Sequence, residues 1–471
     1  MRSIIKLDFN NMLLPVNKYG FKPPVLKIGR VSELIPRAAE KLKAIQNNPE
    51  LRITKGLEWL ELPFQPRKLL IQIEQLADRF AGRFENILSL GIGGSFLGNQ
   101  MLHEVLKSPY YNEFSSLRKG RPRMYFAGNN VDPETLGIFL DNLNLAETGV
   151  VVISKSGETT ETKAAFEIVK ERLKKAVGKK FNRHIIAVTD AKKGSLRAEV
   201  EKLGYESFVV PEGVGGRWSV LSPVGLVTAA IEGTNINELL AGAAVMNAKC
   251  IFPDIWKNPA YMYATLQYLA GKTGKKNISV LMPFADSLKS LAEWYVQLKA
   301  ESLGKKYSRV GIVINAGQTP IPSVGTTDLH STMQLNIEGP YDKIITFIKV
   351  EKFRKDLSLP TLKGDFLSGK SLTKLMHTAL EGTEWALTRE GRLNSTLIMP
   401  EINEFYLGQL IFFFELATAF EGELLDINAY DQPGVESYKN YMYVKLGKSV
   451  PPKIKREVEK QPLSKDNRFI I

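Results

Sequence analysis

The sequence contains a single cysteine, Cys250, among 471 residues. One cysteine cannot form an internal disulfide and cannot supply a zinc cluster, so neither centre is expected. Long hydrophobic runs are also lacking, because the longest candidate, residues 407–420, contains Glu415 and is too short to span a bilayer. Residues 1–12 have no apolar core of the kind found in a signal peptide. These absences predict a soluble, cytoplasmic protein without a membrane partner.

Histidine is scarce as well, with four in the chain: His103, His184, His330 and His377. None of them are paired at the spacing of metal ligands, so no metal site is predicted. His103 and His377 lie in helical patterns and His184 opens a strand, which are positions typical of structural histidines. His330 differs because it ends a polar segment, Gly-Thr-Thr-Asp-Leu-His. It is a candidate for proton transfer, and an ordinary surface histidine is the alternative.

The chain is basic, with 63 Lys and Arg against 50 Asp and Glu, a net charge of +13. A nucleic-acid partner is the first possibility that such an excess raises. The excess is spread out, however. It is strongest at residues 445–471 and at residues 170–183, and we expect the second run to form the solvated end of a helix. No aromatic residues alternate with these basic ones, so no nucleic-acid partner is predicted, and an anionic small substrate or plain solubility is favoured.

Apolar runs typical of buried strands alternate with helical patterns through most of the chain. This alternation favours parallel sheets covered by helices, so the predicted fold class is α/β with two closely packed domains. Strands are expected near residues 86–90, 149–153, 184–188, 208–210, 279–282, 311–315, 344–350 and 397–399. Helices are expected at residues 96–106, 288–303 and 406–420, and one more is expected after residue 160, with its buried face formed by Ala165, Ile168, Val169 and Leu173.

Two turns between a predicted strand and a predicted helix have the composition of anion sites. The first is residues 91–95, Gly-Ile-Gly-Gly-Ser, where glycines permit close approach of a ligand and the helix start offers free amides. A dinucleotide fingerprint would need a third glycine where Phe96 stands, so NAD is not predicted. A tight turn without any ligand is the alternative for this motif.

The second turn is residues 154–160, Ser-Lys-Ser-Gly-Glu-Thr-Thr. Its several hydroxyls, together with helix N-terminal amides, suit a phosphate monoester. The alternative is a cluster of helix caps, but capping needs one hydroxyl rather than four. Glu158 is an unfavourable neighbour for an anion, and we expect it to point to solvent.

A third glycine-containing segment, residues 364–371, matches the nucleotide P-loop pattern letter for letter. A P-loop follows a buried strand, whereas residues 351–363 are charged and contain Pro360. We therefore expect no ATP site there. Three other segments carry polar groups that are weak signals alone: Glu301 at a helix end, Arg217 within residues 213–219, and residues 431–439.

Together, these segments resemble the glucose-6-phosphate isomerase (phosphoglucose isomerase) family. The Gly-Gly-Arg-Trp-Ser segment around Arg217 and the Asp-Gln-Pro-Gly-Val-Glu-Ser-Tyr-Lys segment at residues 431–439 look like the two family signatures. The other loops follow in the family's order, and the match spans about residues 55 to 445. The length suits the shorter bacterial type.

The resemblance implies two flavodoxin-like sugar-isomerase (SIS) domains, each a mainly parallel sheet with helices on both faces, and a homodimer with sites at the subunit interface. The first domain is expected at residues 60–235, with the phosphate-binding loops. The second is expected at residues 1–59 plus 236–445, with the base and the ring-opening residues. Residues 446–471 are expected to form a basic C-terminal tail on the surface.

The resemblance also implies roles for single residues. Glu301 would be the base that moves a proton between C2 and C1, and Arg217 would stabilise the enediolate. His330, supplied by the partner subunit, and Lys439 would assist ring opening. Trp218 stands where the family usually has Tyr or Phe, which would keep an aromatic wall there. The substrate and its phosphate would be bound by Gly94, Ser95, Ser154, Lys155, Ser156, Gly157, Thr159, Gln297 and Gln432.

The implied activity is the reversible isomerisation of glucose 6-phosphate and fructose 6-phosphate, in glycolysis and gluconeogenesis. It would proceed by acid/base proton transfer through a cis-enediol, without a metal or any other cofactor. Such chemistry requires a carboxylate base and a cation beside the developing oxyanion. A sensor that binds a sugar phosphate without turnover, and an isomerase that also accepts mannose 6-phosphate, stay open as alternatives.

Overall fold

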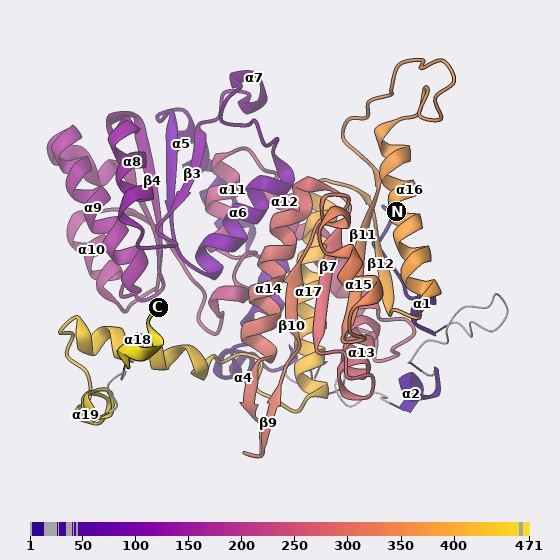
Figure 1. The fold of residues 1–471 in the computed structure, drawn as a ribbon. Coiled ribbons are helices and arrows are strands. Elements are labelled where there is room, and N and C mark those ends of the chain that lie inside the picture. The colour runs from indigo at the N-terminus through magenta and orange to yellow at the C-terminus, as the bar shows by residue number, and fades with distance from the viewer. Residues whose placement is uncertain are drawn as a thin grey trace. The chain divides into compact units, whose positions relative to one another are not determined.

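The computed structural model describes residues 2–13, 26, 28–33, 40, 42–43, 46–460 and 465–471. The chain divides into two units, Met1–Ala429 and Tyr430–Ile471, which are described separately. The larger unit holds two five-stranded sheets and a short two-stranded hairpin (Figure 1).

The first sheet is entirely parallel and has the strand order β3-β2-β4-β5-β6. Counted along the chain, this is the order 2-1-3-4-5 of the flavodoxin-like fold. The three central strands are buried at every position, which is why they consist of apolar runs without alternation. The strands are β2 (Asn86–Leu90), β3 (Arg123–Ala127), β4 (Thr148–Ile153), β5 (Ile185–Thr189) and β6 (Glu206–Val209).

Helices cover both faces of the first sheet (Figure 1). On one face, Leu88 and Val150 pack in a single cluster with side chains of α8, α9 and α10. On the other face, Gly149 leaves room for the ring of Phe80 in α5. The helices around this sheet are α5 (Arg67–Ala81), α6 (Gly94–Leu106), α8 (Pro133–Asn142), α9 (Thr160–Val177), α10 (Ser195–Leu203) and α11 (Pro223–Ile231).

The second sheet has the order β1-β12-β11-β7-β10. Four strands are parallel, and the edge strand β1 runs antiparallel to β12. The separate hairpin consists of two antiparallel strands, β8 and β9. The bounds are β1 (Lys6–Asp8), β7 (Ile278–Pro283), β8 (Lys305–Tyr307), β9 (Val313–Ala316), β10 (Thr319–Pro322), β11 (Lys343–Lys352) and β12 (Asn394–Glu401).

Helices lie on both faces of the second sheet as well. Phe347 of β11 packs with Leu380 and Leu387 of α16, whereas its neighbour Thr346 faces the other way, within 3.2 Å of the Tyr263 hydroxyl in α13. Helix α17 is buried almost along its whole length, including Glu415. The bounds are α12 (Ile236–Cys250), α13 (Pro259–Lys272), α14 (Lys289–Leu303), α15 (Met333–Glu338), α16 (Leu372–Arg389) and α17 (Glu404–Leu424).

Shorter elements complete the two units. In the larger unit they are α1 (Asn10–Leu13), α2 (Ile28–Glu33), α4 (Pro49–Lys55), α7 (Ser115–Arg118) and the 3-10 turns η2 (Glu58–Phe64), η3 (Leu145–Glu147), η4 (Gly178–His184), η5 (Gly216–Trp218), η6 (Asp286–Leu288) and η7 (Thr327–His330). The second unit contains η8 (Pro433–Val435), α18 (Glu436–Lys445), α19 (Pro452–Lys460) and η9 (Asn467–Phe469). Over the described ranges, no helix combines the length and the apolar character that crossing a membrane requires.

The predicted α/β class with two mainly parallel sheets is confirmed, and so are most of the expected elements. Three details are wrong. Residues 311–315 contribute to the β8–β9 hairpin and not to a parallel sheet. Ile168 is 46% exposed, and Phe166 takes the buried position on α9 in its place. Lys170 was expected on a solvated helix end, but it is buried between two carboxylates.

Candidate active site

The two predicted anion turns emerge side by side from the first sheet. Strands β2 and β4 are neighbours, with Leu90 paired to Val152, so the segments that follow them leave the same edge. The strand order reverses between these two strands, because β3 lies beyond β2 and β5 lies beyond β4. In open parallel sheets, ligands bind in the crevice at this switch point, outside the carboxyl ends of the strands.

The glycines of the first turn make room for other parts of the protein. A Cβ atom on Gly94 would lie 1.9 Å from the carbonyl oxygen of Gly216, the residue before Arg217. A Cβ atom on Gly93 would lie 2.9 Å from the side-chain nitrogen of Gln297 in α14, and Gly93 also has a φ of +57°. Residues 213–219, which carry Arg217, are called the arginine segment below. Because the first turn has no side chains at Gly93 and Gly94, both the arginine segment and α14 can pack directly against the start of α6.

The second turn is organised by its own hydroxyls. The Ser154 Oγ accepts a hydrogen bond from the Gly157 amide at 3.1 Å, and the Ser156 Oγ accepts one from the Glu158 amide at 3.1 Å. Thr159 occupies the N-cap of α9, but its side chain makes no capping hydrogen bond. Two hydroxyls thus shape the loop, and the helix-cap alternative does not account for Thr159.

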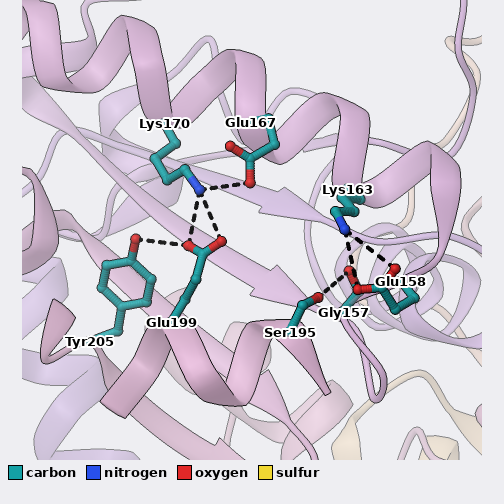
Figure 2. A network of polar contacts seen from close by, with 8 residues as sticks. All are labelled: Gly157, Glu158, Lys163, Glu167, Lys170, Ser195, Glu199 and Tyr205. Carbon is teal, nitrogen blue, oxygen red and sulfur yellow. Dashed lines mark hydrogen bonds and ion pairs between the residues drawn. The ribbon is translucent and has the colours of Figure 1, made fainter. Parts of the chain in front are cut away.

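The charged residues of this turn face different partners. Lys155 donates from its Nζ to the carbonyl oxygen of Val214 at 3.3 Å, close to the arginine segment. Glu158 is partly exposed and forms an ion pair with Lys163, one turn into α9, at 3.2 and 3.3 Å (Figure 2). The negative charge of Glu158 is therefore compensated by a neighbouring cation.

A carboxylate and a guanidinium meet where α14 passes the arginine segment. Arg217 donates from Nη1 to the Oε2 atom of Glu301 at 3.2 Å and from Nε to the Ser302 hydroxyl at 2.7 Å. Its Nη2 donates to the carbonyl oxygen of Ala429 at 2.7 Å. Gln297 lies one turn before Glu301 and donates to its Oε1 at 3.1 Å. Both oxygens of the Glu301 carboxylate are therefore held in a fixed orientation.

The two charged partners differ in exposure. The Arg217 side chain is 2% exposed, whereas that of Glu301 is 32% exposed. The carboxylate is thus accessible from outside while the guanidinium behind it is fixed. Such a pair can remove a proton from carbon and stabilise negative charge on an adjacent oxygen.

His330 is exposed at the end of η7. The turn is organised by Asp328, which accepts hydrogen bonds from the Val324 amide at 2.7 Å and from the hydroxyls of Ser323 and Ser331 at 2.9 Å. Burial acts to raise the pKa of Asp328, but these donors outweigh it, and the pKa lies below its ordinary value. Among the described residues, His330 makes no hydrogen bond to Glu301.

Gln432 and Lys439 belong to the second unit. Lys439 lies in α18, and its Nζ is 3.0 Å from the carboxylate of Glu436. Burial opposes the charged form of Lys439, but the hydrogen bond and the charge of Glu436 prevail and raise the lysine pKa. Gln432 directly precedes η8.

The other histidines have structural surroundings. The His103 Nδ1 lies 2.6 Å from the buried Glu232 carboxylate, and the His377 Nε2 donates to the Val350 carbonyl at 2.7 Å. His184 donates from Nδ1 to the Thr148 carbonyl at 3.0 Å, and burial lowers its pKa.

The position of Trp218 differs from the predicted one. It is fully buried and stacks on Trp59, with ring centroids 4.6 Å apart, so it belongs to the core and is not a wall of the site. The segment that matches a P-loop lies between β11 and α16, where Ser371 caps α16 through the Lys374 amide at 3.2 Å. No strand leads directly into this segment, since β11 ends at Lys352.

Sequence reasoning missed two partners of Arg217. Ser302 follows Glu301 directly, so its closeness to the site was available as a signal. No sequence signal pointed to Ala429. Arg217 contacts its main-chain carbonyl oxygen, and every residue has such an oxygen.

Comparison with known proteins gives consistent matches. The family model described as phosphoglucose isomerase matches residues 75–465. Glucose-6-phosphate isomerase from Carboxydothermus hydrogenoformans is 41% identical over 474 residues, covering 99% of this chain and 99% of that protein. The protein of the same name from Symbiobacterium thermophilum is 39% identical over 396 residues, covering 83% of this chain and 86% of the relative.

Solved structures are similar too. A hypothetical protein from Thermus thermophilus matches with a TM-score of 0.81 and 32% identity, covering 94% of this chain and 100% of that one. A glucose-6-phosphate isomerase from Chlamydia trachomatis matches with a TM-score of 0.72 and 26% identity, covering 84% and 76% of the respective chains. Both likenesses extend over most of the present chain.

Proposed function

Since the chain belongs to the phosphoglucose isomerase family, we propose that it interconverts glucose 6-phosphate and fructose 6-phosphate, as a step of glycolysis and gluconeogenesis. The observation that carries this proposal is the contact between the exposed carboxylate of Glu301 and the buried guanidinium of Arg217 at 3.2 Å. An aldose–ketose isomerase needs this combination of a base and a cation beside an oxyanion.

In the proposed reaction, Glu301 removes the proton from C2 of the open-chain aldose. The electron pair of that C–H bond forms a C1=C2 double bond, and the carbonyl oxygen on C1 gains negative charge, which Arg217 stabilises. A proton then passes from the hydroxyl on C2 to the oxygen on C1 within the cis-enediol, which leaves the negative charge on the oxygen of C2. Glu301 then returns its proton to C1, which completes the ketose. Gln297 would orient the carboxylate and contact the substrate.

The phosphate would be bound by the turn at residues 154–159, mainly by Ser154, Lys155, Ser156 and Thr159, with Gly94, Ser95 and Gly157 nearby. Hydroxyls and amides at the start of a helix favour such an anion. Binding energy from a phosphate remote from C1 and C2 can be used to orient the reacting carbons. Gln432 would make a further substrate contact.

Ring opening is proposed for His330 and Lys439, with His330 supplied by the second subunit of a homodimer. The exposure of His330 and the lack of a hydrogen bond from it to Glu301 are compatible with a role outside its own chain's site. We further propose a cytoplasmic enzyme that needs no metal, with domain limits at residues 60–235, at 1–59 plus 236–445, and a tail at 446–471.

The decisive experiment is NMR of glucose 6-phosphate with the enzyme in D₂O that contains a metal chelator. Formation of the ketose together with deuterium at C2 of the recovered aldose would support proton transfer through an enediol without a metal. Because Glu301 can return the abstracted proton before it exchanges with solvent, single turnovers can move hydrogen from C2 to C1 without deuterium. A complete lack of deuterium after prolonged equilibration of the two sugars would favour a hydride shift over the enediol, and loss of turnover in the chelator would contradict metal independence. Binding of the sugar phosphate with no turnover would favour a sensor.

A further inference from the structure

The turn proposed to bind phosphate is held from behind by the start of α10. The Ser195 amide donates to the carbonyl oxygen of Ser156 at 3.1 Å. The Ser195 hydroxyl donates to the next carbonyl, that of Gly157, at 3.0 Å, as Figure 2 shows. One residue thus binds two successive carbonyl groups of the turn, although it lies far from the turn in the sequence.

The fit between the two segments is close. A Cβ atom on Gly194 would lie 2.2 Å from the Ser156 carbonyl oxygen. A Cβ atom on Gly157 would lie 2.4 Å from the Leu196 amide nitrogen and 2.6 Å from the Ser195 hydroxyl oxygen. Gly194 and Gly157 also have φ values of +97° and +72°, which favour glycine. These glycines allow α10 to reach the turn.

The two carbonyl contacts determine where the adjoining amides point. In a trans peptide unit, the N–H and the C=O point in opposite directions. With the Ser156 carbonyl turned toward α10, the Gly157 amide points away from it and donates to the Ser154 hydroxyl. With the Gly157 carbonyl turned the same way, the Glu158 amide donates to the Ser156 hydroxyl.

Because the hydroxyls of Ser154 and Ser156 accept from these amides, each can donate its own hydrogen to another group. A hydroxyl has one hydrogen and two lone pairs, so a hydroxyl that accepts from an amide still has its hydrogen. Within the described part of the chain, neither Ser154 nor Ser156 donates its hydroxyl hydrogen to another group. Both hydrogens are therefore free for an anion, and they are oriented by the peptide units that Ser195 holds.

An ion-pair network fixes α10 in this position. Glu199 lies one helical turn after Ser195 and accepts two hydrogen bonds of 3.0 Å from the Lys170 ammonium group of α9. Lys170 also donates to Glu167 at 2.7 Å, and the Tyr205 hydroxyl donates to Glu199 at 3.3 Å (Figure 2). Helices α9 and α10 are therefore braced together, with the turn between their N-terminal ends.

We propose that Ser195 is a positioning residue for phosphate recognition: it holds the carbonyls of Ser156 and Gly157 so that the hydroxyls of Ser154 and Ser156 present their hydrogens to the phosphate. This inference rests on the proposed function of the turn. Ser195 itself need not touch the substrate, because it acts through the main chain of the turn.

The test is the Ser195→Ala variant. Loss of one neutral hydrogen bond is expected to weaken affinity by roughly two- to tenfold. The KM for glucose 6-phosphate should rise by that factor while kcat stays within about twofold, and the Kd for inorganic phosphate, measured by calorimetry, should rise in parallel. An unchanged Kd for phosphate would overturn the proposal, and so would a fall in kcat with KM unchanged.

Two further comparisons keep the result interpretable. Ser195→Thr retains the hydroxyl and should bind phosphate nearly as the wild type does, whereas the equally shaped Ser195→Val should bind it as weakly as Ser195→Ala. Equal affinity of the Thr and Val variants would contradict the proposal even if Ser195→Ala fails to fold.

Ser371→Ala, which removes a cap from α16, should lower the melting temperature without changing phosphate affinity. Because calorimetry needs no turnover, an inactive wild type would contradict the isomerase activity and leave this test in place.

Discussion

Glu301 and Arg217 form an ion pair across segments that lie 84 residues apart in the sequence. The groups that hold the guanidinium include the Glu301 carboxylate, the Ser302 hydroxyl and the Ala429 carbonyl. The carboxylate is held by Arg217 and Gln297 and still reaches the surface. Preorganisation of this kind keeps the cost of rearrangement during the reaction low.

A substitution at Glu301 is the sharpest test at the scale of single residues. Glu301→Gln keeps the size of the side chain and an oxygen that can accept from Arg217, but an amide cannot take up the C2 proton. We expect kcat to fall by about 10²- to 10⁴-fold, with KM nearly unchanged, in a coupled assay of fructose 6-phosphate formation or consumption.

Glu293→Gln is the matched control, because Glu293 lies on the same helix and forms a long ion pair of 3.7 Å with Lys289. It should keep the wild-type kcat. If Glu301→Gln turned over at the wild-type rate, Glu301 would not be the base.

Single residues also show where sequence reasoning stops. The family resemblance implied roles for Glu301, Arg217 and Gln297, and the fold brings their side chains within hydrogen-bonding distance. The partner of Glu158 could be named only from the structure, because an ion pair with Lys163 depends on how the turn enters α9. The burial of Trp218 against Trp59 was not predictable either, since the contact joins η2 to η5.

At the scale of elements, α6 begins against the main chain of η5. The contact leaves no space for a side chain at Gly94. Because η5 carries Arg217, the start of α6 and the guanidinium cannot move independently.

Gly94→Ala should therefore separate these two elements. The added methyl group would overlap the Gly216 carbonyl group, so we expect a lower melting temperature and a loss of kcat as Arg217 is displaced. Thermal unfolding and the isomerase assay measure both effects. Gly137→Ala in α8, where nothing lies within 4 Å of the added carbon, should instead raise stability by about 1 kcal/mol. Wild-type activity and stability in Gly94→Ala would show that α6 and η5 can separate freely.

The elements differed in how well the sequence predicted them. The buried central strands β2, β4 and β5 are apolar at most positions and were found correctly. The edge strand β3 begins with Arg123 and is only partly buried, so it lacks that signal. The β9 region contains Ile312, Val313 and Ile314, which look like a buried strand although all three are exposed.

At the scale of the whole molecule, the family resemblance and the α/β class predicted from the sequence are confirmed. The strand order 2-1-3-4-5 explains why the two predicted anion turns, which lie far apart in the chain, leave the sheet side by side. The order of motifs along the chain carried the resemblance. The domain limits and the roles of all the site residues stay predictions. For His330, Lys439 and Gln432 the fold adds least, because the first is expected to act in a partner subunit and the other two lie in the second unit.

The stability of the whole molecule should depend on pH through Glu415. This side chain is fully buried in α17, and neither carboxyl oxygen has a hydrogen-bond partner in the described chain. Burial raises its pKa well above the ordinary value. Below the ordinary glutamate pKa, Glu415 is protonated in both the folded and the unfolded chain, so this group does not lower the free energy of unfolding. Above it, only the unfolded chain releases the proton, so stability falls by about 1.4 kcal/mol per pH unit until the folded pKa is reached.

Glu415→Gln cannot ionise and should escape this loss. The melting temperature of the variant should exceed that of the wild type by a larger margin at pH 7.5 than at pH 5, measured by thermal unfolding. Glu381→Gln, a change at an exposed glutamate of α16, should show no such difference. An equal margin for Glu415→Gln at both pH values would mean that Glu415 is not held protonated in the folded protein.

The backbone contact between Gly94 and Gly216 has a consequence for how this enzyme can diverge. The Gly216 side of the contact is a carbonyl oxygen, which every amino acid has, whereas the Gly94 side depends on the absence of a Cβ atom. Substitutions at position 216 can therefore leave the contact in place, while any substitution at position 94 has to move one of the two segments.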